Sequence, residues 1–205
     1  MAQSPREADR SRTEGESVSV GFRTRLFTDE RLRFMAQVGV EDVFVDAIAP
    51  GFEADAYPDE VDVDGDRYLE LAPDAIPSVE RLREIDDLLA EFNLRFAGVH
   101  SLHYGMYGDI MFDREGRETQ TEGIATLLRN LGEAGIPTLG YQWNPRGVVP
   151  MRTETEAEVR GGAKATAWDE ADLGEIETPP GELERAYTEA ECWEHYEGFL
   201  GEILP

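Results

Sequence analysis

The chain has 205 residues, enough for one domain with a substantial core, but it is short for a complete (β/α)8 barrel, which needs about 250. Forty-four acidic residues against nineteen basic ones give a formal net charge of −25, and Lys164 is the only lysine. This charge excludes nucleic acid and anionic membranes as partners, and the composition is typical of a halophile's proteins, in which molar salt screens the repulsion.

The sequence shows neither a membrane-spanning segment nor a secretory signal. No run of 18 apolar residues occurs, and residues 1–16 are too polar for a secretory signal, so we expect a soluble, cytoplasmic protein. We interpret 1–16 as a disordered lead-in and 17–205 as one domain. Cys192 is the only cysteine, which excludes an internal disulfide; its helical context predicts a packed side chain.

The first two predicted units each pair a strand with a helix. A strand at 17–25 precedes a helix at 28–39, which has Thr28 as N-cap and Gly39 as its stop. A second strand at 40–48 precedes a helix at 78–93, whose apolar residues recur on one stripe.

The last two predicted units repeat this order. A strand at 95–102 leads to a helix at 119–135, and a strand at 138–145 leads to a helix at 188–204 that opens with a capping box of Thr188 and Glu191. Four βα units in series predict an α/β fold with parallel strands, the first half of a (β/α)8 TIM barrel. An open doubly wound sheet is the alternative. Long loops follow strands two, three and four, at 49–77, 103–118 and 146–187, so the active site is expected at the strands' carboxyl ends.

Two histidines mark the end of the third strand. His100 and His103 are three residues apart on a strand running into a loop, a spacing that points them to opposite faces, so we expect no shared metal. At the rim, His103 is the candidate for proton transfer. His100 is either a substrate contact or a satisfied core histidine, and His195 is expected on the surface.

Polar residues of other segments are expected at the same rim. Gln142 and Asn144 are two apart and so share a face, and Arg146 and Arg152 follow in the next loop. Arg23 lies near the end of the first strand. Arginine suits a bidentate grip on a carboxylate, although a surface salt bridge is the alternative for each. The acidic stretch 59–70 has Gly65 two places early for an EF-hand, so we interpret it as a solvated loop.

The chain resembles the mannonate dehydratase family of xylose-isomerase-like TIM barrels. The resemblance rests on a rim histidine, on an amphipathic helix with an RNL.AG segment, on a YN(F/W)MP strand end, on an RT pair, on a G.(S/T)A.A(F/Y)D loop and on a first strand with FRW. The matching segments are His103, RNLGEAG at 129–135, YQWNP at 141–145, Arg152 with Thr153, ATAWD at 165–169 and GFRTR at 21–25. Gln142 stands where the family has asparagine, and Asn144 where it has methionine.

The resemblance implies dehydration of D-mannonate to 2-keto-3-deoxy-D-gluconate in hexuronate breakdown. It implies sugar-acid binding by Arg23, Arg152 and His100, hydroxyl contacts by Gln142 and Asn144, and proton transfer by His103. The family's metal, expected to be Mn²⁺, is held by histidine, cysteine and aspartate on later strands that this chain does not reach. We therefore expect a truncated or split form that is inactive alone, with a second chain or copy completing the barrel.

Two other functions stay open at this point. One is a sugar isomerase or epimerase of the wider xylose-isomerase-like group. The other is a catalytically silent remnant or a sugar-acid-binding protein.

Overall fold

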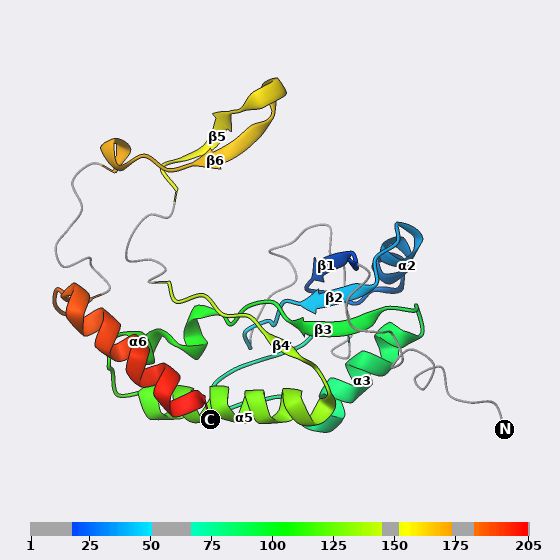
Figure 1. Ribbon diagram of the computed structural model, residues 1–205, viewed down its shortest axis with the longest axis horizontal. Coiled ribbons are helices and arrows are strands. Elements are labelled where there is room, and N and C mark those ends of the chain that lie inside the picture. Colours follow the sequence, from blue (N-terminus) through cyan, green and yellow to red (C-terminus); the bar gives the residue numbers. More distant parts are fainter. Residues whose placement is uncertain (1–17, 51–66, 145–151, 174–182, 205) are drawn as a thin grey trace.

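The computed structural model describes residues 18–50, 67–144, 152–173 and 183–204. Four strands form one parallel sheet, in which each pairs with its neighbour in the sequence (Figure 1). A doubly wound sheet would reverse its strand order, so this succession is that of a partial barrel, as predicted. The strands are shorter than predicted: β1 at Gly21–Thr24, β2 at Asp42–Val45, β3 at Arg95–Val99 and β4 at Thr138–Leu139.

The four predicted helices are present, each within a few residues of its expected ends. Side-chain caps explain where three of them begin: Thr28 and Ser78 each accept a hydrogen bond from a backbone N–H of the first turn, and Thr188 with Glu191 forms the predicted capping box. Gly135 ends another with a left-handed φ of 82°. The helices are α2 at Asp29–Gln37, α3 at Val79–Ala90, α5 at Arg117–Ala134 and α6 at Glu189–Ile203.

The predicted loops contain short elements that the sequence pattern did not reveal. The loop after β3 holds a 3-10 turn, η2 at Tyr104–Met106, and one helical turn, α4 at Gly108–Met111. The long loop after β4 holds an antiparallel hairpin of β5 at Glu154–Glu158 and β6 at Lys164–Ala167, with the 3-10 turns η3 at Arg160–Gly162 and η4 at Glu170–Asp172. Figure 1 shows this hairpin projecting away from the sheet, and its strands are mostly exposed.

The core lies between one face of the sheet and the helices. Val43 and Val45 of β2 are fully buried, as are Leu82, Ile85 and Leu89 of α3. Because side chains alternate along a strand, Phe44 lies on the opposite face of β2.

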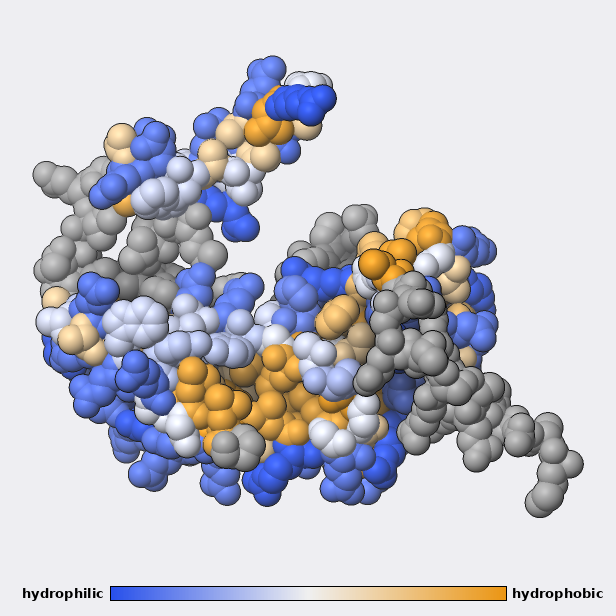
Figure 2. Space-filling view, viewed as in Figure 1, coloured by the Kyte–Doolittle hydropathy of each residue, from blue (hydrophilic) through white to orange (hydrophobic). Residues whose placement is uncertain are grey.

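Apolar surface remains at the β4 side of the molecule. Figure 2 shows it as a band across the middle of one face, above the hydrophilic outer surface of α5. The partly buried Leu128 of α5 and Leu139 of β4 belong to the elements that meet there.

Two residues of α6 differ from their predicted exposure. The helical context predicts a packed Cys192, but this side chain is exposed, because α6 turns that side outward and fully buries Phe199 instead. His195, expected on the surface, is half-buried, and its Nδ1 lies 2.9 Å from the carbonyl oxygen of Met111. The predictions for 1–16, for Arg146 and for most of 59–70 lie outside the described residues. In the described segments, no helix is long and apolar enough to cross a membrane.

Candidate active site

Three side chains meet where β1, β2 and β3 end, and we call Arg23, Asp46 and His100 the carboxyl-edge trio. The Nε of Arg23 donates to Oδ2 of Asp46 over 2.6 Å. The Nδ1 of His100 lies 3.1 Å from Oδ1 of the same carboxylate. One carboxylate of β2's end therefore links polar groups from the two neighbouring strands.

The register of the sheet brings the trio together. The backbone N–H of Asp46 donates to the last residue of β1, and that of His100 donates to Val45, so the parallel pairing continues past the strand ends. Arg23 stands beside Phe44 in the β1–β2 register, and His100 follows two residues after the partner of Phe44 on β3. Alternation then places all three trio residues on the sheet face of Phe44, away from the helices.

Burial differs strongly within the trio. Asp46 is 7% exposed, whereas the side chains of Arg23 and His100 are 57% and 34% exposed. A buried carboxylate must be compensated by a cation or by hydrogen bonds, and Arg23 supplies both. The His100 Nδ1 is itself buried; it lies within ion-pair distance of Asp46 but its angles do not make a hydrogen bond. His100 therefore belongs to the edge of the sheet and not to the apolar core.

His103 is held by a different partner. Its Nε2 lies 2.7 Å from the carbonyl oxygen of Leu71, in the segment that continues beyond β2. A carbonyl oxygen only accepts, so Nε2 carries the proton and Nδ1 of the neutral ring is the basic nitrogen. The ring packs against Gly105, where an added Cβ would lie 3.1 Å from it. This half-buried imidazole is thus held by the Leu71 carbonyl at Nε2, and its Nδ1 lies on the side of Gly105.

The residues after β4 lie beside an aromatic cluster. Gln142 and Asn144 are half-buried on either side of Trp143, whose ring stacks on Phe199 with centroids 5.1 Å apart. The hydroxyl of Tyr107 donates to the backbone carbonyl of Asn144 over 3.5 Å. The predicted contact of the two amide side chains with sugar hydroxyls stays a prediction.

A tyrosine pair extends this cluster toward α6. The hydroxyl oxygens of Tyr141 and Tyr196 are 2.7 Å apart. Burial, followed by this hydrogen bond, raises the pKa of Tyr141 to about 12. The hydrogen bond between the two hydroxyls joins the segment after β4 to α6 as part of the packing.

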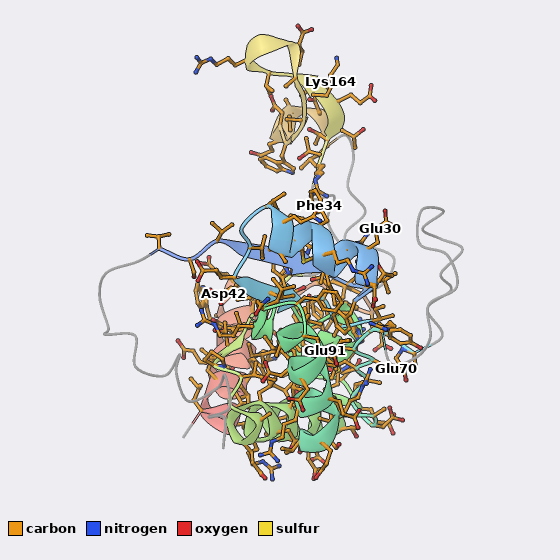
Figure 3. The ribbon with its side chains drawn as sticks, turned by 90° about the vertical axis from the view of Figure 1, so that its right-hand side faces the viewer. Glu30, Phe34, Asp42, Glu70, Glu91 and Lys164 are labelled. Atoms are coloured by element: carbon orange, nitrogen blue, oxygen red, sulfur yellow. The ribbon has the colours of Figure 1, made fainter. Side chains whose placement is uncertain are left out.

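Arg152 is not brought to the trio. It is exposed two residues before β5, and the structure shows no contact between it and Arg23, Asp46 or His100. Beside it, the Thr153 hydroxyl accepts the backbone N–H of Asp169 across the base of the hairpin. Figure 3 shows how far the hairpin, marked by Lys164, stands from β2, marked by Asp42.

The described residues do not fit a resident divalent cation. They contain no group of three or more histidine, cysteine, aspartate or glutamate side chains arranged to hold a metal. The trio offers one carboxylate and one imidazole, and the Arg23 guanidinium that completes it is a cation.

Sequence reasoning missed Asp46, the centre of the trio. Asp46 directly follows the apolar residues VFV of β2. A polar residue in that position, at the carboxyl end of a barrel strand, is a sequence signal for a site residue. Among 44 acidic residues, that signal does not stand out.

Comparison with known proteins agrees with this fold. The model of the D-mannonate dehydratase (UxuA) family matches residues 67–205. The crystal structure of mannonate dehydratase from Streptococcus suis serotype 2 is similar, with a TM-score of 0.66 and 19% sequence identity. The likeness covers 93% of this chain and 49% of that one, so the chain spans about half the length of that protein. At this identity, the structural likeness shows the fold alone.

Proposed function

Because the chain belongs to the D-mannonate dehydratase family, we propose that it supplies the substrate-side half of a hydro-lyase that converts D-mannonate to 2-keto-3-deoxy-D-gluconate and water. The observation that carries this proposal is the carboxyl-edge trio. It fixes an arginine at the end of the sheet where barrel enzymes bind their substrates. The later strands would come from a second chain or copy.

The proposed roles follow from the chemistry of each group. In the reaction, a base removes the proton from the carbon next to the carboxylate, the hydroxyl of the next carbon leaves and takes up a proton, and the resulting enol becomes the ketone. Arg23 would bind the carboxylate, and Nδ1 of His103 would take or return a proton. His100, Gln142 and Asn144 would contact the rest of the sugar acid, whereas Arg152, before the hairpin, takes no part in this arrangement.

The metal of the reaction, which we expect to be Mn²⁺, has no site among the described residues. It would offset the negative charge that develops on the carboxylate oxygens when the proton is removed from the adjacent carbon. The carboxyl-edge trio would also fit a second function, a sugar-acid-binding protein without catalysis.

The test is reconstitution. The chain would be co-expressed with the carboxy-terminal half of a homologous enzyme in molar KCl with Mn²⁺, and formation of the keto-deoxy acid would be followed. We expect activity from the pair and none from either half alone. Activity of this chain alone would contradict the split-site proposal, and an assembled but inactive pair would favour the binding protein.

A matched pair of variants separates chemistry from folding. His103→Gln keeps a donor for the Leu71 carbonyl but removes the basic nitrogen, so the reconstituted enzyme should lose at least about a hundredfold in kcat. The control is His195→Asn, because His195 makes the same kind of contact with the Met111 carbonyl. It should retain kcat, and equal losses in the two variants would show that His103 is only structural.

A further inference from the structure

We propose that Asp46 is a positioning residue: it aims the Arg23 guanidinium at the carboxylate of the substrate. This inference rests on the proposed function, since the substrate class is a sugar acid. Asp46 is 7% exposed, so it would act through Arg23, which it holds by the hydrogen bond from Nε.

The contact that Arg23 makes with Asp46 runs through Nε and does not use the two terminal nitrogens. The Arg23 side chain is 57% exposed. A carboxylate can be gripped by the two terminal nitrogens of a guanidinium in a bidentate pair. The hydrogen bond at Nε fixes the plane of the guanidinium before the substrate binds. The arginine then loses less conformational entropy when it binds the carboxylate of the substrate.

A second aspartate–arginine pair, Asp42 with Arg95, lies at the other end of β2 and serves as a structural comparison. Asp42, labelled in Figure 3, lies four residues before Asp46, is also 7% exposed, and accepts Nε of Arg95 over the same 2.6 Å. Arg95 also brings Nη2 to within 2.5 Å of the same oxygen, and the hydroxyl of Ser19 donates to the carboxylate. The two arginine side chains are equally exposed, at 56% for Arg95 and 57% for Arg23, so the two pairs differ in their contacts: Arg95 engages Asp42 through Nε and Nη2, whereas Arg23 engages Asp46 through Nε.

The charge of the chain explains why such a device is needed. In molar salt the field of a net charge of −25 is screened beyond a few ångströms, so only a cation in direct contact, such as Arg23, can favour a sugar acid over a neutral sugar. His100, on the other side of Asp46, adds a polar group from β3 to the same place. The ligand class that fits this edge is a small carboxylate with hydroxyl groups.

The test compares the two aspartates at the opposite ends of β2. Each is 7% exposed, and each accepts a hydrogen bond from the Nε of an arginine. The whole chain, in molar KCl, would be titrated with D-mannonate and with the neutral polyol mannitol, and binding would be measured by saturation-transfer NMR. Asp46→Asn should raise the Kd for D-mannonate by about tenfold relative to Asp42→Asn, which should bind as the parent chain does. Asp46→Glu, which keeps a carboxylate, should recover part of the loss. Mannitol binding should respond equally to both substitutions.

The exposed arginines provide a second pair in case either aspartate variant fails to fold. Arg23→Lys retains the charge but loses the planar fork, so it should weaken D-mannonate binding, whereas Arg95→Lys should not. Equal effects within both pairs would overturn the inference.

The outcomes also separate this inference from the proposed function. Selective loss of D-mannonate binding in Asp46→Asn, without dehydration in the reconstituted pair, supports the positioning role and refutes the lyase. Dehydration that is equally fast in both asparagine variants supports the lyase and refutes the positioning role. No binding of D-mannonate by the parent chain or the reconstituted pair refutes both.

Discussion

Gly140 is the position where the structure predicts the largest effect of adding one methyl group. It follows β4, and its N–H donates to the Val99 carbonyl over 2.8 Å. A Cβ added to Gly140 would lie 2.0 Å from the carbonyl oxygen of His100. The obstacle is backbone of the neighbouring strand, which no side-chain rotation can relieve.

The cost of Gly140→Ala can be worked out from this geometry. Ordinary contact begins near 3.4 Å, so the two strands must separate by about 1.4 Å, the difference between 3.4 Å and 2.0 Å. That shift breaks the hydrogen bond to Val99, worth about 1 kcal/mol, and leaves strain of about 1–3 kcal/mol. We expect a loss of about 2–4 kcal/mol in the free energy of unfolding, a large part of a typical domain's 5–15 kcal/mol.

The assay is urea unfolding in molar KCl, followed by circular dichroism, with Gly132→Ala as the control. Gly132 lies in α5, and a Cβ added there would meet no atom within 4 Å, so the alanine should stabilise the helix by up to about 1 kcal/mol. If Gly140→Ala is as stable as Gly132→Ala, the close approach of β4 to His100 is wrong, and with it the placement of that side of the site.

Three further predictions concern charge, capping and the core. With a net charge of −25, the thermal midpoint should rise between about 0.1 M and about 3 M KCl, and a flat or falling trend would reject adaptation to salt. The Thr188 backbone N–H, together with its hydroxyl, lowers the pKa of Glu191 from 4.5 to about 2. Since folding holds the ionised form, its contribution is complete above pH 4.5 and is lost as the pH falls toward 2. Amide protection factors, which are corrected for the intrinsic exchange rate, should therefore fall in the first turn of α6 over that window, and Glu191→Gln should remove this fall. Leu127→Ala, at a fully buried site, should cost about 2–5 kcal/mol in urea unfolding, whereas Leu204→Ala, 56% exposed, should change stability by less than about 0.5 kcal/mol.

The helices could be predicted because their signals are local. Apolar periodicity and the caps at Thr28 and Thr188 lie within a few residues of each helix start, and the structure confirms them. The hairpin was missed because ETEAE and KATA lack the apolar alternation of a half-buried strand. β4 is short because the chain leaves the sheet soon after Leu139, at an edge that no further described strand covers.

The site was predictable in location but not in its connections. In a parallel sheet all strands end at the same edge, so the order of strands and helices along the chain is enough to place Arg23 and His100 together at the carboxyl edge. Their link through Asp46 depends on the register in which Gly21 faces Asp42, a long-range pairing that the sequence does not encode locally. Arg152 was expected at the same rim, but it lies two residues before β5. The sequence pattern did not predict that hairpin, and so it did not predict the position of Arg152.

The succession of strands has a consequence for how the protein is made. Each strand of the main sheet pairs with the strand before it, so a chain leaving the ribosome can extend the sheet one unit at a time without waiting for distant residues. Asp46 acquires its guanidinium partner once β2 docks on β1, and His100 arrives with β3. The groups of the carboxyl edge are thus assembled in the order of synthesis, before α6 packs on α4 and α5.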